Sequence, residues 1–77
     1  MTTVSISLNS IEKVKTFVNE IAKYECDFDL ISGRYIIDAK SIMGIFSLDL
    51  SQNITLKIHA DDDELSAILE SLKPYMA

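Results

Sequence analysis

The sequence predicts an α+β fold, in which a four-stranded antiparallel sheet is covered on one face by helices in the order βαββαβα. Four short segments carry apolar residues at every second position, which is typical of strands with one buried face. Two longer segments carry apolar residues at three- and four-residue steps, which is typical of amphipathic helices. All these apolar faces can be buried together when both helices lie on the same side of the sheet.

The first predicted strand lies in TVSISLNS, whose alternating apolar residues are Val4, Ile6 and Leu8. The segment NSIEKVKTFVNEIAKY then predicts a helix that ends near Tyr24. Two N-caps are open for this helix: Asn9, paired with Glu12 in a capping box, or Ser10. Its predicted buried stripe is Ile11, Val14, Phe17, Val18, Ile21 and Ala22.

A β-hairpin is predicted in CDFDLISGRYIIDA. Asp27 and Asp29 point to solvent in this interpretation, and the inward residues are Cys26, Phe28 and Leu30. The letters SGR indicate a turn, because Gly33 can adopt a positive φ. The partner strand is predicted at Tyr35–Ala39.

A short helix with Ser41 as its N-cap is predicted in AKSIMGIFSL. Such a helix can turn only one side inward. If Ile45 and Leu48 point to the core, three apolar side chains are left at least partly exposed: Ile42, Met43 and Phe46. These would form an adaptable protein-binding patch. The alternative is that all of them belong to the core, since a small domain is short of apolar side chains.

The last strand is predicted in ITLKIHA and the last helix in DDDELSAILESLKPYM. The strand turns Ile54, Leu56 and Ile58 inward and Thr55, Lys57 and His59 outward. A capping box of Asp61 and Glu64 begins the helix, which is predicted to end by Lys73 because Pro74 follows. Its buried stripe is Leu65, Ile68, Leu69 and Leu72.

Composition sets the class of protein. The 77 residues predict one domain, residues 1–77, and the net charge of −5 argues against a nucleic-acid partner. Cys26 is the one cysteine, so no internal disulfide forms, and we expect it to be a buried or half-buried strand residue in a reducing compartment. The sequence has no apolar run long enough for a membrane span and no signal sequence, which predicts a cytoplasmic protein.

The sequence contains no recognisable catalytic constellation, and we expect neither enzymatic activity nor a cofactor. Its one histidine, His59, is predicted on the solvent side of a strand. The acidic run Asp61–Glu64 lacks the glycine and the spacing of a calcium loop and fits a helix start better, so no metal site is expected. The two glycines, Gly33 and Gly44, do not form a phosphate-binding loop.

The letters KSIMG at Lys40–Gly44, continued by IFSL, resemble the regulatory-serine segment of HPr, the histidine phosphocarrier of the bacterial sugar phosphotransferase system. The element order also resembles the HPr fold, an open-faced β-sandwich. The resemblance implies that HPr kinase phosphorylates Ser41. It further implies a surface for that kinase and for a catabolite-control repressor, made of Ile42, Met43 and Phe46. We add Lys40, which is next to Ser41 in sequence, as a partner-binding residue. Phe46 stands where a methionine is common in the family.

One motif of the family is missing. HPr carries its phosphate on a histidine at the start of the first long helix, where this chain reads LNSIEKVKTF. The resemblance places about Ser10 at the histidine, Glu12 at the arginine and Lys13 at the proline, and no shift of register brings in a histidine. We therefore expect no catalytic residue, because a serine phosphate ester lacks the labile P–N bond of phosphohistidine.

Three hypotheses follow for the function. The first is an HPr-like regulatory binding module phosphorylated at Ser41, similar to the catabolite-repression HPr paralogue that lacks the histidine. Its partners would be HPr kinase/phosphorylase, a transcriptional regulator and, at the apolar patch, a partner or a second copy of the chain. The second is an active phosphocarrier that uses a non-standard residue such as His59. The third is a structural or oligomerising protein in which Ser41 is only a helix cap.

Overall fold

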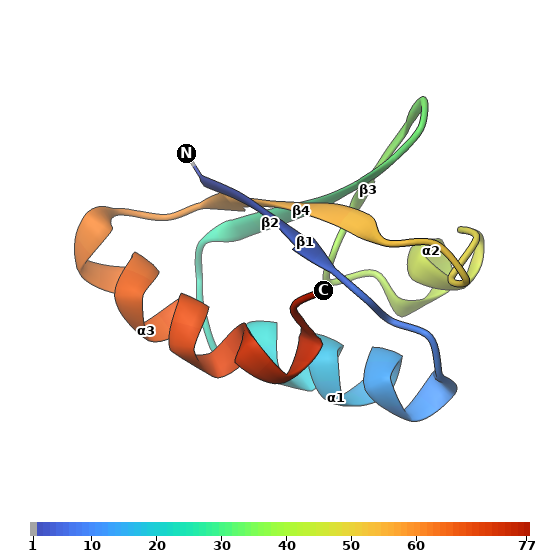
Figure 1. Ribbon diagram of the computed structural model, residues 1–77. Coiled ribbons are helices and arrows are strands. Elements are labelled where there is room, and N and C mark those ends of the chain that lie inside the picture. The colour runs from blue at the N-terminus through green and yellow to red at the C-terminus, as the bar shows by residue number, and fades with distance from the viewer. Residues whose placement is uncertain (1) are drawn as a thin grey trace.

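The computed structural model describes residues 2–77 and contains the predicted elements in the predicted order (Figure 1). The strands are β1 (Thr2–Ile6), β2 (Asp27–Ser32), β3 (Tyr35–Asp38) and β4 (Ile54–His59). The helices are α1 (Ile11–Ile21), α2 (Ile42–Phe46) and α3 (Asp62–Leu72), followed by a 3₁₀ turn, η1 (Lys73–Tyr75). Within residues 2–77, no helix has the length and apolar character needed to cross a lipid bilayer.

The four strands form one antiparallel sheet in the order β1-β4-β2-β3. Figure 1 shows α1 and α3 side by side under one face of this sheet, with the other face uncovered. The register joins Val4 to Leu56, Leu56 to Leu30 and Leu30 to Ile37, so one row of apolar residues crosses all four strands. The α+β open-faced sandwich expected from the sequence is confirmed.

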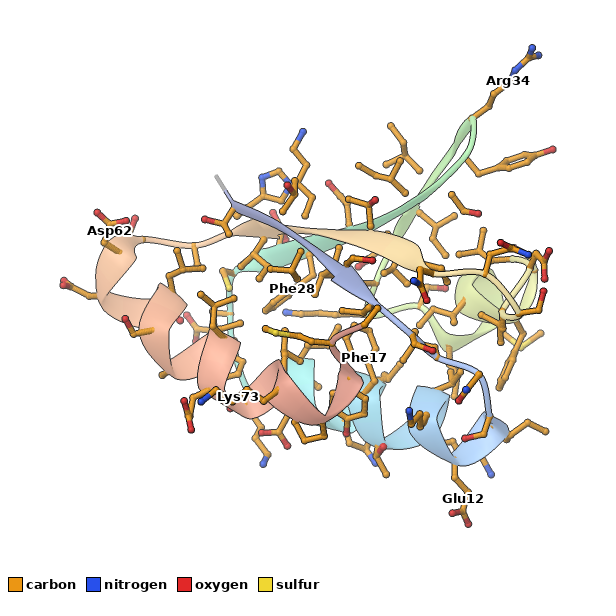
Figure 2. All side chains as sticks on the ribbon, viewed as in Figure 1. Glu12, Phe17, Phe28, Arg34, Asp62 and Lys73 are labelled. Carbon is orange, nitrogen blue, oxygen red and sulfur yellow. The ribbon has the colours of Figure 1, made fainter. Side chains whose placement is uncertain are left out.

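The core lies between the sheet and the two long helices. Every fully buried side chain among residues 2–77 is apolar, and the two largest, Phe17 of α1 and Phe28 of β2, point toward each other's layer (Figure 2). Two tyrosines join the α1 region to the C-terminal segment: Tyr75 packs edge-on against Phe17 with ring centroids 5.6 Å apart, and the Tyr24 hydroxyl lies 2.8 Å from Ser71 Oγ of α3. The remaining core residues are those that the alternation and the helical stripes predicted, together with Ala39 and Ile45.

The β2–β3 hairpin turns at Gly33 and Arg34, as the SGR signal predicted. Gly33 has φ +60, and no other residue of 2–77 has a positive φ. A glycine with positive φ at the first of two turn positions fits a tight hairpin turn that follows the right-handed twist of the strands.

The predictions for the helix ends were partly wrong. Helix α1 is capped by Ser10, the second of the two candidates, and not by a capping box of Asn9 and Glu12. It ends at Ile21, and the chain continues in turns to Tyr24. Asp61 is the N-cap of α3, but its side chain makes no capping hydrogen bond, so the second capping box is also wrong. Caps depend on side-chain rotamers, which residue spacing alone does not set.

Two members of the predicted α1 stripe are exposed. Ile11 is 62% exposed because it lies at the first residue of the helix and at the margin of the stripe. Ala22 is exposed because it follows the last helical residue. The buried part of the stripe is Val14, Phe17 and Ile21, with Val18 packed beside it.

Candidate functional site

The candidate site begins at Ser41, between β3 and α2. Ser41 has an extended backbone, and its Oγ accepts a hydrogen bond from the Gly44 N–H at 3.2 Å, so the predicted N-cap is confirmed. The Ser41 N–H donates to the Asp38 carbonyl at 3.0 Å, which fixes the turn into the helix. The side chain is exposed. A reagent or an enzyme can therefore approach the hydroxyl oxygen from solvent.

Gly44 keeps the space around that hydroxyl open. A Cβ built on Gly44 would lie 3.3 Å from Ser41 Oγ and 3.3 Å from Ile37 Cδ1. The absence of a side chain at Gly44 therefore has two effects. It lets α2 lie close to β3, and it leaves room beside the capping oxygen of Ser41.

Helix α2 turns one side inward, as the sequence predicted. Ile45 is fully buried and Leu48 is half-buried. The opposite side carries three apolar residues, which we call the α2 patch: Ile42, Met43 and Phe46. Met43 is 78% exposed and Phe46 is 41% exposed, while Ile42 is half-buried. The alternative in which all these side chains belong to the core does not hold for Met43 or Phe46.

Lys40, the cation next to Ser41 in sequence, contacts the segment that follows α1. Its ammonium group donates to the Tyr24 carbonyl at 2.7 Å and lies 5.7 Å from the centroid of the Phe28 ring. The side chain is half-buried and connects the turn before α2 with the segment after α1. The Lys40 ammonium is therefore engaged by a backbone carbonyl 16 residues earlier in the chain.

The start of α1 contains Ser10, which the resemblance places near the family's histidine position. Ser10 Oγ accepts from the Lys13 N–H at 3.1 Å, and its carbonyl accepts from the Val14 N–H at 3.1 Å. Glu12 points into solvent from the lower side of the helix (Figure 2). Helices α1 and α2 contact each other, so the start of α1 and the α2 patch lie at the same end of the molecule (Figure 1).

The exposed Ile11 at this end was missed by the sequence reasoning, which assigned it to the core. The one signal available was its position at the first residue of the helix, where a side chain has no preceding turn beside it.

His59 lies elsewhere, on the open face of the sheet. Its Nε2 is 2.8 Å from Asp29 Oδ2, and both groups line an open hollow of about 400 Å³. The other residues of the hollow are Asp27, Phe28 and Asp38. In the part of the chain that the structure describes, no three carboxylate, imidazole or thiol groups are arranged to hold a metal ion.

Cys26 is half-buried, as expected, but it lies one residue before β2 and is not the strand residue that the sequence predicted. Burial is the main factor that raises the pKa of its thiol above the ordinary value of 9.0, and the nearby Glu64 carboxylate raises it further. A thiol of this kind is protonated at neutral pH and is a poor nucleophile.

Comparison with known families gives a match over most of the chain. The model described as "PTS HPr component phosphorylation site" matches residues 12–77, a stretch that includes Ser41 and the α2 patch and begins after Ser10.

Solved structures with the same fold agree with this match. HPr-C-His from Thermoanaerobacter tengcongensis superimposes with a TM-score of 0.74 and 29% identity, over 94% of this chain and 90% of that one. The phosphocarrier protein HPr from Bacillus anthracis str. Ames gives 0.71 and 26%, over 99% and 94%. Crh, the Bacillus subtilis catabolite repression containing protein, gives 0.64 and 22%, over 94% and 87%, and is described as a swapped, intertwined dimer. At that identity, the likeness to Crh concerns the fold alone.

Proposed function

Because the chain belongs to the HPr family of the phosphotransferase system, we propose that it is a regulatory binding module phosphorylated on Ser41, rather than a histidine phosphocarrier. One observation carries the proposal: the exposed Ser41 hydroxyl begins α2 directly beside the exposed α2 patch. A modification at this oxygen changes the charge at the rim of an apolar surface. Such a change alters which partners can bind there.

The surroundings of Ser41 favour a phosphate that is bound by cationic side chains of a partner protein. A phosphoserine adds about −1.5 to −2 charges at neutral pH. Helix α2 has only 5 residues, so its dipole offers little compensation. Lys40, the adjacent cation in sequence, is held by the Tyr24 carbonyl. The phosphate would therefore select a partner that brings arginine or lysine to the edge of the α2 patch.

The groups at the start of α1 support the absence of carrier activity. The hydroxyl of Ser10 is occupied as a helix cap, and Glu12 would repel a phosphorylated donor. His59, the one histidine in the sequence, alternates with the buried residues of β4, so it lies on the face opposite to the helices, where it is hydrogen-bonded to Asp29. On this account the chain acts in the cytoplasm by binding to an HPr kinase and a transcriptional regulator, and uses no cofactor.

Labelling by HPr kinase tests the proposal. Incubation of the protein with HPr kinase and ATP should add one phosphate, which peptide mass spectrometry should locate on Ser41. A matched variant, Ser41→Asn, keeps a side-chain oxygen that can cap α2 but should not be labelled. Two further variants, Ser10→Ala and Ser47→Ala, should be labelled like the unchanged protein. A phosphate on any other residue, or none at all, would contradict the proposal.

A further inference from the structure

The two edges of the sheet differ in how they are covered. The outer side of β1 is occupied by Tyr75–Ala77, since the Ser7 N–H donates to the Tyr75 carbonyl at 2.8 Å and the Ala77 N–H to the Ser5 carbonyl at 3.0 Å. The other edge is β3, and among residues 2–77 no strand lies beyond it. An unpaired edge presents backbone groups that can accept another strand.

The groups that face this free edge follow from the hydrogen-bond alternation. The Ala39 N–H donates to the Phe28 carbonyl at 2.9 Å, so Ala39 and, two residues earlier, Ile37 turn their backbone groups toward β2. Ile36 and Asp38 consequently turn their N–H and C=O groups outward. The Asp38 carbonyl already accepts from the Ser41 N–H. Among residues 2–77, Ile36 is therefore the residue of β3 whose outward N–H and C=O groups both lack a hydrogen bond.

We propose that β3 is a homodimer surface, on which two copies of this chain pair antiparallel with Ile36 opposite Ile36 of the second copy. The two central hydrogen bonds join the Ile36 N–H of each copy to the Ile36 carbonyl of the other. This pairing is isologous, because a two-fold axis passes between the two isoleucines. It places Arg34 of each copy opposite Asp38 of the other, so that opposite charges meet twice.

Other registers are less favourable. If one copy slides along the other by an odd number of residues, Ile36 lies opposite a residue whose N–H and C=O groups face β2, so the central hydrogen bonds cannot form. If one copy slides by two residues along the other, Arg34 comes to lie opposite Lys40. If it slides by two residues in the other direction, Ile36 comes to lie opposite Arg34. The register centred on Ile36 is therefore the one that joins the free backbone groups and also matches the charges.

The surface is accessible and apolar at its centre. Ile36 is 68% exposed and Tyr35 is 70% exposed. Figure 1 shows the β2–β3 hairpin projecting beyond the rest of the sheet, and Figure 2 shows Arg34 at its tip, directed away from the molecule. Pairing would extend Ile36 and its cross-strand neighbour Ile31 into an apolar row shared by both copies. This inference is independent of phosphorylation at Ser41.

Amide exchange on the unchanged protein tests the register directly. Between about 10 µM and about 1 mM, the Ile36 N–H should become at least tenfold better protected as the chain dimerises. The Ala39 N–H, which is bonded to Phe28 within the chain, should be protected to the same degree at both concentrations. A chain that stays monomeric over this range, or an Ile36 N–H whose protection does not change, would overturn the proposal.

Variants separate this surface from the α2 patch. Ile36→Lys sets two like charges opposite each other, and should raise the dimer Kd by about tenfold or more in sedimentation experiments. Ile11→Lys makes the same change at a residue of similar exposure, 62% against 68%, and should leave the Kd unchanged. A dimer that survives Ile36→Lys, or one that is lost in the Ile11→Lys or Met43→Gln/Phe46→Gln variants instead, would show that the copies meet elsewhere.

Discussion

Ser41 has a structural role as the N-cap of α2 and a proposed regulatory role as the phosphate acceptor. Its Oγ caps α2 through the Gly44 N–H at 3.2 Å, and the same oxygen is the proposed phosphate acceptor. The two roles can be separated, because asparagine is an N-cap residue as good as serine and carries no hydroxyl.

Replacement of Ser41 by alanine should lower the free energy of unfolding by about 0.5–2 kcal/mol, the usual cost of losing an N-cap. Ser41→Asn should restore most of this loss. The measurement is urea unfolding, with Ser66→Ala, an exposed serine inside α3, as the matched control that should not destabilise. Equal stabilities of Ser41→Ala and the unchanged protein would show that the cap hydrogen bond contributes nothing.

Cys26 gives a prediction for alkaline pH. Its folded-state pKa is raised above 9.0 mainly by burial, so folding favours the neutral thiol. This contribution to stability is fully present below pH 9.0 and is lost as the pH rises through the higher folded pKa. Alkylation by iodoacetamide should therefore be slower in the folded protein than in urea at every pH from neutral to about 9. Faster alkylation of the folded protein would contradict the direction of the pKa shift.

At the residue scale, sequence reasoning succeeded where a side chain's role depends on its near neighbours. Ser41 was predicted as a cap because the helix signal follows it directly. The contact of Lys40 was not predicted, because its ammonium binds a carbonyl 16 residues earlier in the chain and residue spacing does not show which distant segment lies nearby.

At the scale of elements, α2 is a helix with a single buried residue, Ile45, and an apolar outer side. Its spacing predicted which residues point inward, because a helix of this length on a sheet has one inward side. The same spacing could not fix the helix ends, since a cap is decided by one side-chain rotamer.

Changing Met43 and Phe46 together to glutamine should leave the fold intact. Met43 is 78% exposed and Phe46 is 41% exposed, so the free energy of unfolding should fall by about 1 kcal/mol or less. Binding of the Ser41-phosphorylated protein to a catabolite-control repressor should weaken by at least about tenfold. Thermal melting and titration calorimetry measure the two effects. An unfolded double variant would mean that these side chains support the core.

At the scale of the whole molecule, Tyr75 joins α1 to the strand segment at the covered edge of the sheet. Its ring packs on Phe17, its hydroxyl donates to Thr16 Oγ1 at 2.9 Å, and its carbonyl accepts from the Ser7 N–H beside β1. The segment from Tyr75 therefore links α1 with the covered edge of the sheet.

Two replacements of Tyr75 should lower the free energy of unfolding by different amounts. Tyr75→Phe removes one exposed hydrogen bond and should lower the free energy of unfolding by about 0.5–1.5 kcal/mol. Tyr75→Ala also removes the aromatic contact with Phe17 and should lower it by about 2 kcal/mol more. Chemical unfolding of both variants measures this. Equal losses would show that the ring contact with Phe17 does not stabilise the fold.

The layers of the fold were predictable because each element has one apolar face, and a single arrangement buries all of them. The order β1-β4-β2-β3 was not deduced from these patterns, since alternation tells which face of a strand is buried but not which strand lies next to it. The free edge of β3 and the covered edge of β1 follow from that order, so no surface that depends on them was visible in the sequence.

The most direct measurement of the central claim is the chemistry and position of the phosphate on the intact protein. One sample receives phosphoenolpyruvate and the general enzyme of the phosphotransferase system, and the other receives ATP and HPr kinase. The account predicts no label in the first sample and, in the second, one acid-stable phosphate on Ser41. An acid-labile phosphate gained from phosphoenolpyruvate, on His59 or on any other residue, would contradict it and would show that the chain is a phosphocarrier.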